Sequence, residues 1–280
     1  MKFTKMQGAG NDFIIINNIQ LKIPTERFPY IAKKVCERRV SVGGNALMVV
    51  DKAERGGDFQ MRFYNSDGSL GEMCGNGARC IARYAFENQI AGESMNIETL
   101  AGDVKAWKID QRKYKIRLNN PEIIKLHNNI TVDGTEYECS YIELGNPGLP
   151  HAVVTLNGFD QWEENKLLEL GKKIRYYKDF PKGANVNFCE HMTGNNLKIK
   201  TYERGVEDFT LACGTGSGST AVAMALKGVV NKDEIVNLYV PGGILSVIVD
   251  MNEDIIENLY LIGDTNIVAV GEITDQDLII

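Results

Sequence analysis

A cysteine set in a glycine-rich turn occurs twice in this chain, 139 residues apart. The two copies are Met73-Cys74-Gly75-Asn76-Gly77-Ala78 and Ala212-Cys213-Gly214-Thr215-Gly216-Ser217, and each opens a run of small and apolar residues. Such a run after a glycine turn predicts a helix whose first backbone N–H groups are free to bind an anion. The same position stabilises a thiolate. The repeat therefore predicts two similar halves, each with a reactive cysteine at the start of a helix.

Other segments keep nearly the same offset, in the same order along the chain. The matched pairs are residues 12–15 with 151–154, 44–47 with 183–186, 63–65 with 202–204 and, with one residue of slippage, 101–110 with 241–250. A repeat this long predicts two structural copies rather than a solenoid, whose period is roughly 20 to 50 residues.

The hydrophobic pattern predicts mostly strands, with one helix of small and apolar residues in the middle of each half. We expect these helices over residues 77–87 and 216–227, each wrapped by its own sheet. The fold class is therefore α+β, with two pseudo-symmetric domains. The first is expected over residues 1–119, with a last strand at about 264–280 returning to it, and the second over residues 120–263.

Composition and charge limit the location and the partners of the protein. The chain has 280 residues and a net charge of −6, and it lacks a basic cluster that would bind nucleic acid. No apolar run approaches the ~18 residues of a membrane span, and the amino terminus lacks the apolar core of a signal peptide. We therefore expect a cytoplasmic protein with no nucleic-acid or membrane partner. A homodimer is one option, since dimers are the commonest homo-oligomers.

Two cysteines in equivalent positions suit the inversion of a carbon centre by proton transfer. One group must remove the proton from one face, and another must supply a proton to the opposite face. A free cysteine has a pKa of about 8.5, which a helix N-terminus lowers. Two helix N-termini would also hold a substrate carboxylate while negative charge develops on the α-carbon. Cys74 and Cys213 are thus predicted to be the acid and base acting on a small amino-acid substrate.

Other interpretations of the cysteine motifs are weaker. A disulfide between Cys74 and Cys213 is disfavoured by a reducing compartment. Zinc is disfavoured because the chain has no Cys-X-X-Cys and its three histidines are scattered. The turn at Gly214 lacks the last glycine of a dinucleotide fingerprint and the Lys-Ser/Thr of a P-loop. No cofactor and no metal are expected. The remaining cysteines fit small buried hydrophobic residues, namely Cys36, Cys80, Cys139 and Cys189.

Further motifs make nearly the whole chain resemble the diaminopimelate epimerase family. The matching segments are residues 8–13, 65–69, 72–79, 185–188, 202–206 and 211–216. The resemblance implies a cofactor-independent isomerase of lysine and peptidoglycan biosynthesis, which interconverts LL- and meso-2,6-diaminopimelate. It also implies that each domain is a mostly antiparallel, barrel-like sheet around its central helix, with the active site in the cleft between the domains. Proline racemases and hydroxyproline epimerases are similar, but typically carry histidine where Asn76 stands.

The resemblance also implies a role for individual residues. Cys74 and Cys213 would be the paired acid and base, with His151 near Cys74. Arg204 would bind the distal carboxylate of the substrate, and Glu203 would lie near an ammonium group or near Cys213. The full set of substrate-binding residues that the resemblance implies is Asn11, Asn65, Gly75, Asn76, Asn185, Glu203, Arg204, Gly214 and Thr215.

Two departures from the family pattern concern the recognition of the substrate. Ala46 stands where the family usually has a glutamine, and Gly148-Leu149-Pro150 precedes His151 where the family commonly reads Gly-Asn-Pro-His. Either Gly148-Leu149-Pro150 is an insertion-like variant that keeps Asn146 in place, or Pro-His is aligned and Leu149 occupies the asparagine position. The repeat offset favours the second alignment, with His151 as the fixed point. The loss of two amides either loosens recognition or indicates another substrate. A racemase of another amino acid, and a non-catalytic relative that senses redox state through its two thiols, therefore remain alternatives.

Overall fold

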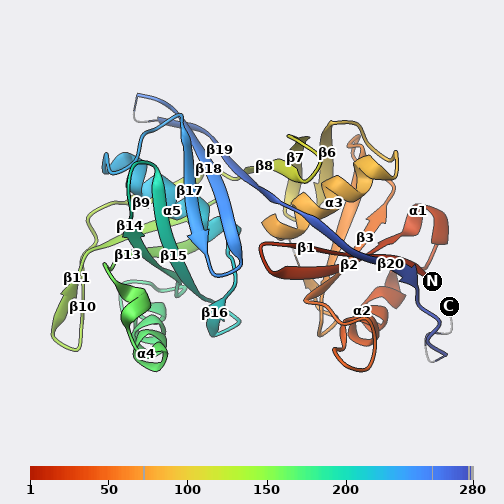
Figure 1. The fold of residues 1–280 in the computed structure, drawn as a ribbon, viewed down its shortest axis with the longest axis horizontal. Coiled ribbons are helices and arrows are strands. Elements are labelled where there is room, and N and C mark those ends of the chain that lie inside the picture. The colour runs from red at the N-terminus through yellow and green to blue at the C-terminus, as the bar shows by residue number, and fades with distance from the viewer. Residues whose placement is uncertain (72, 254, 277, 279–280) are drawn as a thin grey trace. The chain divides into compact units, whose positions relative to one another are not determined.

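The computed structural model describes all residues except 72, 254, 277, 279 and 280 (Figure 1). Glu72, within one of the matching segments, thus lies outside the described residues. Contacts divide the chain into unit 1, Met1–Ile116 with Ile262–Ile280, and unit 2, Arg117–Leu261. The boundaries between the units fall within strands β8 (Lys113–Leu118) and β19 (Ile255–Asp264).

Unit 1 is built on two antiparallel strand pairs joined by a parallel pairing. Strand β1 pairs antiparallel with β2 and with β20, β2 runs parallel to β3, and β3 pairs antiparallel with β4. A second parallel pairing joins β4 to β6, which pairs antiparallel with β7. The bounds are β1 Lys2–Gly8, β2 Asn11–Asn17, α1 Asn18–Leu21, α2 Phe28–Cys36, β3 Ala46–Asp51, β4 Phe59–Asn65, β5 Leu70–Gly71, α3 Gly75–Glu87, β6 Ser94–Thr99, β7 Gly102–Lys108 and β20 Asn266–Glu272.

Unit 2 repeats this order of pairings. Strand β12 pairs antiparallel with β13, β13 runs parallel to β14, and β14 pairs antiparallel with β15. Strand β15 runs parallel to β17, which pairs antiparallel with β18. The bounds are β9 Pro121–Lys125, β10 Ile130–Val132, β11 Thr135–Tyr137, β12 Cys139–Leu144, β13 Leu149–Thr155, α4 Glu164–Arg175, β14 Asn185–His191, β15 Asn196–Glu203, β16 Asp208–Thr210, α5 Gly214–Leu226, β17 Ile235–Val240 and β18 Gly243–Asn252.

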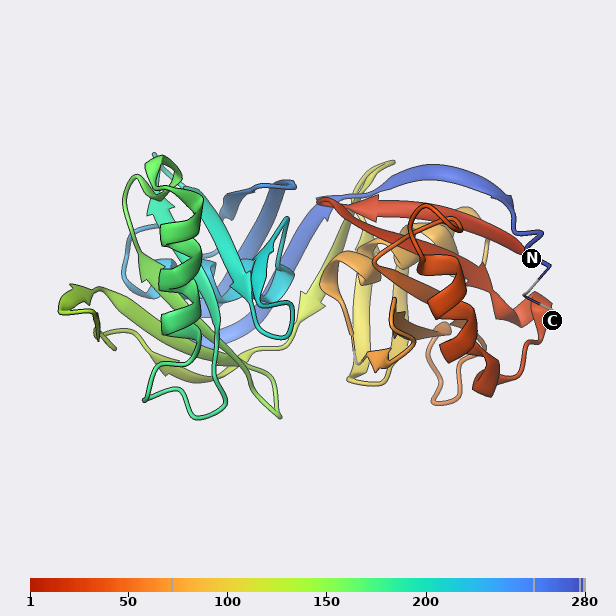
Figure 2. The same cartoon turned by 90° about the horizontal axis from the view of Figure 1, so that it is seen from below.

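Each unit has one 13-residue helix enclosed by strands and one shorter amphipathic helix on its outside. Helix α3 contacts β1, β2, β3 and β7, and α5 contacts β12, β13, β14 and β18. The outer helices are α2 and α4, drawn in orange-red and green in Figure 2. Helix α2 buries Ile31 and Val35 in the hydrophobic core of unit 1. Helix α4 buries Leu167 and Ile174 in the hydrophobic core of unit 2. Burial of such an apolar stripe contributes most of the stability of a surface helix.

The strand register changes one correspondence that the sequence offset predicts. Phe13 on β2 lies opposite Ala46 on β3, whereas His151 on β13 lies opposite Asn185 on β14. Ala46 and Asn185 are 139 residues apart, as are the two cysteines, so they are equivalent positions. Their partners across the strand pair, Phe13 and His151, are therefore equivalent too. The predicted match of His151 with Asp12 is therefore wrong by one residue. Burial agrees, since Phe13 and His151 are both buried and Asp12 is half-buried.

The same one-residue change occurs in the next strand pair. Tyr64 lies opposite Leu47, and Tyr202 lies opposite Val186. Tyr64 therefore corresponds to Tyr202, and Asn65 corresponds to Glu203 rather than to Arg204. Adjacent residues of a strand face opposite sides of the sheet, so this difference changes which side chains are equivalent in the two units.

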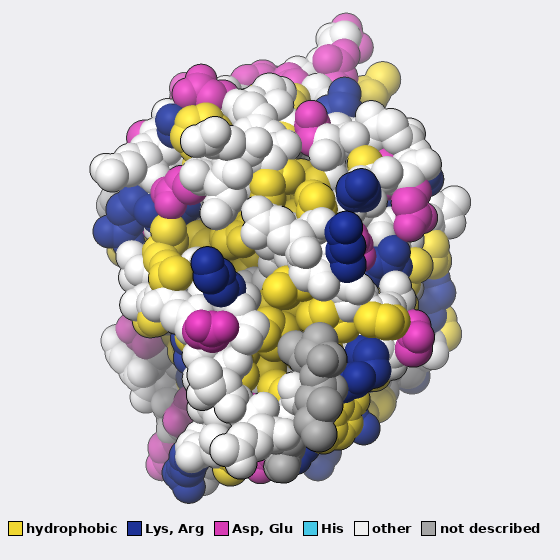
Figure 3. Space-filling view, turned by 90° about the vertical axis from the view of Figure 1, so that its right-hand side faces the viewer, with side chains coloured by type: hydrophobic (Ala, Val, Ile, Leu, Met, Phe, Trp, Pro, Cys, Tyr) yellow, Lys and Arg dark blue, Asp and Glu magenta, His cyan; other side chains and the backbone are white. Residues whose placement is uncertain are grey.

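Strand β20 carries apolar side chains at the surface of unit 1. Val268 and Val270 are exposed, and β20 pairs with β1 in an antiparallel register. Figure 3 shows one face on which hydrophobic side chains lie between lysine, arginine and acidic side chains.

Among the helices of the described chain, none has the length and apolarity needed to cross a membrane.

Candidate active site

Cys74 and Cys213 occupy the same position in their units. Each is the N-cap of a 13-residue helix, with extended backbone angles of φ −132° and ψ 121° for Cys74 and φ −119° and ψ 113° for Cys213. Their carbonyl oxygens accept the first helical hydrogen bonds, from the N–H of Ala78 at 2.8 Å and of Ser217 at 2.9 Å. Both thiols therefore lie at the positive end of a helix dipole.

The turn around Cys213 depends on glycine. The backbone N–H of Gly216 donates to Sγ of Cys213 at 3.4 Å, and Oγ1 of Thr215 lies 3.5 Å from the same sulfur. A Cβ on Gly216 would collide with Oδ1 of the buried Asn187. Only glycine therefore lets the helix N-terminus approach this strand closely enough to hold the thiol.

In unit 1, two predicted asparagines lie in one hydrogen-bonded chain beside Cys74. Nδ2 of Asn76 donates to Oδ1 of Asn11 at 2.7 Å, and Oδ1 of Asn76 accepts from Nη2 of Arg79 at 2.8 Å. Asn65 ends β4, where its Nδ2 donates to Oγ of Ser69 at 2.9 Å. Asn11 and Asn76 are thus together, whereas Asn65 forms a separate contact.

In unit 2, Asn185 and Arg204 are also in contact. Oδ1 of Asn185 accepts the backbone N–H of Arg204 at 2.8 Å, and its Nδ2 donates to the carbonyl of Pro150 at 3.3 Å. Nη1 of Arg204 donates to the carbonyl of Lys182 at 3.3 Å. Burial raises the pKa of the Glu203 carboxyl, next along the chain. Predicted residues of the second half are therefore held in one network.

His151 is a buried, neutral side chain. Its Nδ1 lies 3.3 Å from Nδ2 of Asn187, and its Nε2 has no hydrogen-bond partner among the described residues. Burial, with the charge of Arg204 as a second cause, lowers the pKa of His151 to about 3. The ring therefore carries no charge at neutral pH.

Asn187, which lies beside His151, is a residue to which the sequence motifs gave no role. Its Nδ2 also donates to the carbonyl of Ala152 at 3.2 Å, and its Oδ1 accepts from Oγ1 of Thr201 at 2.9 Å. The available signal was its place two residues after Asn185, which puts both amides on the same side of strand β14. Buried amides are rarely left without partners, so such a residue marks a network.

We predict that His151 makes stability depend on pH. The unfolded state binds a proton below a pKa of about 6.5 and the folded state does not, so stability is lost as pH falls from 6.5 towards 3. The expected loss is about 1.4 kcal/mol per pH unit. In His151→Gln, the difference between unfolding free energies in urea at about pH 7 and about pH 5 should shrink by roughly 2 kcal/mol.

A matched control for this prediction is His127→Gln, because His127 is exposed. This variant should keep the pH dependence of the wild type. An equal loss of stability on acidification in His151→Gln and in the wild type would contradict a buried neutral histidine.

The two departures from the family pattern occupy defined places. Ala46 is fully buried on β3, opposite Asn65. Leu149 begins β13, and a Cβ on Gly148 would collide with the Glu143 carboxylate. That buried carboxylate accepts from the Tyr141 hydroxyl at 2.6 Å and from Nζ of Lys182 at 3.1 Å. The segment before His151 is therefore packed against a polar network.

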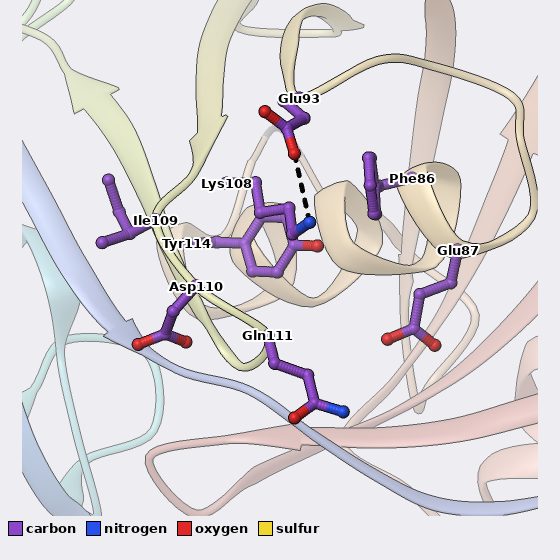
Figure 4. Close-up of a pocket in the computed structure, with 8 residues that line it drawn as sticks. All are labelled: Phe86, Glu87, Glu93, Lys108, Ile109, Asp110, Gln111 and Tyr114. Atoms are coloured by element: carbon purple, nitrogen blue, oxygen red, sulfur yellow. Dashed lines mark hydrogen bonds and ion pairs between the residues drawn. The ribbon is translucent and has the colours of Figure 1, made fainter.

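A surface pocket of about 280 Å³ in unit 1 is lined by none of the predicted site residues. Figure 4 shows Nζ of Lys108 pointing towards Glu93, with which it forms an ion pair at 3.2 Å. The same Nζ lies 4.0 Å from the centre of the Phe86 ring.

Within the described part of the chain, no group of three or more histidine, cysteine, aspartate or glutamate side chains is placed to hold a metal ion.

The fold is that of solved structures named as racemases, epimerases and phenazine biosynthesis proteins. A PhzF-family phenazine biosynthesis protein from Bacillus anthracis matches with a TM-score of 0.74 and 16% identity, over 98% of this chain and 99% of that one. A probable proline racemase from Agrobacterium radiobacter K84 matches with a TM-score of 0.69 and 14% identity, over 99% and 94%. At these identities the likeness shows the fold alone, and it confirms the predicted fold class.

Sequence similarity identifies the family within this fold. The family model for diaminopimelate epimerase matches residues 3–124 and 144–268. A diaminopimelate epimerase from Aquifex aeolicus is 38% identical over 99% of both chains, and one from Hydrogenobaculum sp. is 37% identical over 97% of this chain and 98% of its own. The chain belongs to the diaminopimelate epimerase family, as its motifs indicated.

Proposed function

We propose that the protein interconverts LL- and meso-2,6-diaminopimelate by proton transfer between two cysteines at an α-carbon. Membership of the diaminopimelate epimerase family supports the substrate and the isomerase activity. The observation that carries the mechanism is the equivalent placement of Cys74 and Cys213 at the N-termini of two enclosed helices. A cysteine at such a position is stabilised as a thiolate, and thus acts as a base.

The proposed steps balance in protons and charge. The thiolate of one cysteine takes the α-proton and becomes a thiol, which leaves a carbanion conjugated with the α-carboxylate. The thiol of the other cysteine gives its proton to the opposite face and becomes the thiolate. The backbone N–H groups of Gly75, Asn76, Gly214 and Thr215 would hold the reacting carboxylate, where negative charge increases in the transition state.

The polar residues would position the rest of the substrate. Arg204 would pair with the distal carboxylate, while Asn185 orients the Arg204 backbone through its 2.8 Å hydrogen bond. Asn11, already bonded to Asn76, would bind one amino-acid end, and Asn65 would bind the other. Glu203 and His151 would serve as auxiliary groups near the cysteines. Because burial lowers its pKa to about 3, His151 would act as a neutral hydrogen-bonding group and not as a base.

An isotope experiment tests this function directly. LL-Diaminopimelate incubated with the protein in deuterium oxide should become meso-diaminopimelate with deuterium at one α-carbon, because the incoming proton exchanges with solvent through a thiol. NMR and mass spectrometry measure inversion and label. The double variant Cys74→Ala/Cys213→Ala is the negative control. Absence of both inversion and label in the wild type would overturn the proposal.

A second candidate function is racemisation of another amino acid on the same scaffold. The observation that favours it is a fully buried methyl group at Ala46, where the resemblance to the family implies a glutamine amide. Leu149 would replace a second amide only in one of the two alignments of Gly148-Leu149-Pro150. Deuterium at the α-carbon of another amino acid, and none in diaminopimelate, would support this candidate. A redox-sensing relative would label neither. Cytoplasmic location and a homodimer stay predictions.

A further inference from the structure

Arg79 is a fully buried cation whose guanidinium lies at the start of α3. The side chain extends back along the helix, so that Nη1 donates to the carbonyl of Gly75 at 3.3 Å and Nη2 donates to Oδ1 of Asn76 at 2.8 Å. Gly75 and Asn76 directly follow Cys74. Among the described residues, no carboxylate forms an ion pair with Arg79, and its Nε has no hydrogen-bond partner.

This arrangement is costly unless an anion forms nearby. An arginine stays protonated in proteins, and the burial of an uncompensated charge strongly destabilises a fold. Burial lowers the pKa of Arg79, whereas Cys80, Cys74 and Asp264 act in the opposite direction. Arg83, one turn further along α3, instead pairs with Glu87 at 2.7 Å and donates to the carbonyl of Thr265 at 2.8 Å. Arg79 is thus the cation of this helix without a permanent carboxylate partner in the described chain.

The groups around Arg79 differ in their ability to supply the negative charge. The thiol of Cys80 is fully buried and burial raises its pKa to about 12, so it stays neutral. Asp264 is exposed, so water screens its charge. Cys74 is half-buried at the helix N-terminus, where the helix dipole favours an anion. Of these three described groups, the Cys74 thiolate is the best placed to balance Arg79 in the free enzyme.

The second helix has no equivalent charge. The residue that corresponds to Arg79 at the offset of 139 is Gly218, and α5 contains no charged residue. A Cβ on Gly218 would meet the apolar side chains of Leu118 and Leu259. The two helix N-termini are therefore alike in backbone and unlike in electrostatics, because α3 carries the buried cation Arg79 and α5 carries no charged residue.

We propose that Arg79 is a positioning residue that makes Cys74 the thiolate of the resting pair and holds Asn76 towards Asn11. The inference rests on the proposed two-cysteine function and adds to it the protonation state of each thiol before substrate binds. Cys213 is then the thiol in the direction in which Cys74 removes the α-proton, and the roles are exchanged in the reverse direction. Arg79 acts through the charge at the helix start and through the hydrogen bond of Asn76, which in turn bonds Asn11 at 2.7 Å.

Alkylation of the full chain by iodoacetamide, without substrate, measures the ionisation of each thiol. The rate is followed at several pH values, and peptide mass spectrometry reports Cys74 and Cys213 separately. In the wild type, the alkylation rate of Cys74 is expected to reach half of its maximum, its midpoint, at a lower pH than the rate of Cys213. In Arg79→Met, the Cys74 midpoint should rise by about 1 to 3 pH units, and that of Cys213 should stay, because an opposite charge shifts a pKa by this amount.

Two further variants separate charge from structure. Arg79→Lys keeps the charge without the two-pronged contact, so it should retain most of the low Cys74 midpoint and lose part of kcat through Asn76. Arg83→Met is the matched control, since it removes a cation of the same helix that already has a carboxylate partner. Its Cys74 midpoint should move by less than that of Arg79→Met.

Several outcomes would overturn the inference. Cys213 ionising at the lower pH in the wild type would do so, even if Arg79→Met failed to fold. An unchanged Cys74 midpoint in a folded Arg79→Met would do the same. The readout needs no substrate, so a wild type that inverts no diaminopimelate would refute the proposed function while the order of ionisation could still stand.

Discussion

Replacing either Cys74 or Cys213 by alanine is expected to lower the rate of LL-to-meso inversion by at least about a thousandfold. Each variant keeps one thiol and can therefore serve only one face of the α-carbon. The helix N-terminus and its N–H groups remain, so binding of the carboxylate should change less than turnover. The expected signature is a large fall in kcat with a modest change in KM, since the lost interaction acts in the transition state.

The measurement compares inversion and solvent deuterium uptake in the two single variants. Cys36→Ala is the matched control, because Cys36 is buried in the core of unit 1 and burial raises its pKa to about 12. This control should stay within a few fold of the wild type. Inversion coupled to deuterium uptake in Cys74→Ala would show that the two-thiol mechanism is wrong.

The position of the cysteines was predictable because a local motif and a long repeat agreed. Each Cys-Gly-X-Gly turn predicts a helix start, and the offset of 139 implied that both starts are equivalent. The structure has 13-residue helices beginning at Gly75 and Gly214. The expected starts at residues 77 and 216 were two residues late, since glycine disfavours a helix interior but is tolerated in the first turn.

The strand register was less predictable, because an offset between sequences cannot show where a strand slips by one residue. His151 and Phe13 occupy equivalent positions although the offset matched His151 with Asp12. Both strands are apolar over several consecutive residues, so no alternation of apolar and polar residues shows which positions of the two strands are equivalent. Only the hydrogen-bonded pairing with the neighbouring strand identifies the equivalent residues.

The supporting polar residues were missed for a different reason. Arg79 and Asn187 carry side chains that are normally at the surface, and sequence alone favours a solvated position for them. Asn187 contacts His151 and Thr201 on neighbouring strands, whereas Arg79 bonds to Asn76 of its own helix, which the surrounding strands enclose. Arg79 shares its helix with Arg83 and Glu87, and Asn187 shares its strand with Asn185, so residue type alone did not mark either as buried.

Arg204→Met is expected to lower kcat/KM for diaminopimelate by about a hundredfold to a thousandfold, because loss of one partner of a buried charge-assisted pair costs 2 to 5 kcal/mol. Arg204 is half-buried, its backbone is held by Asn185, and its Nη1 is bonded to the carbonyl of Lys182. The Arg204 side chain is thus held in place by specific contacts, and we do not expect a neighbouring cation to take over its role. Arg204→Lys should recover only part of the loss, since an ammonium lacks the two-pronged geometry of a guanidinium.

The role in binding the distal carboxylate is tested with a substrate that lacks this group. L-Lysine is diaminopimelate without one carboxylate, so its slow α-deuteration by the wild type should be little changed in Arg204→Met, whereas the rate with diaminopimelate falls. Arg117→Lys is the control, because Arg117 is exposed and contacts the carbonyl of Glu257 at 3.4 Å. Equal losses with both substrates would assign Arg204 to the reacting end of the substrate or to folding. A selective loss with diaminopimelate follows only if the guanidinium meets the distal carboxylate, because the two substrates share every other group.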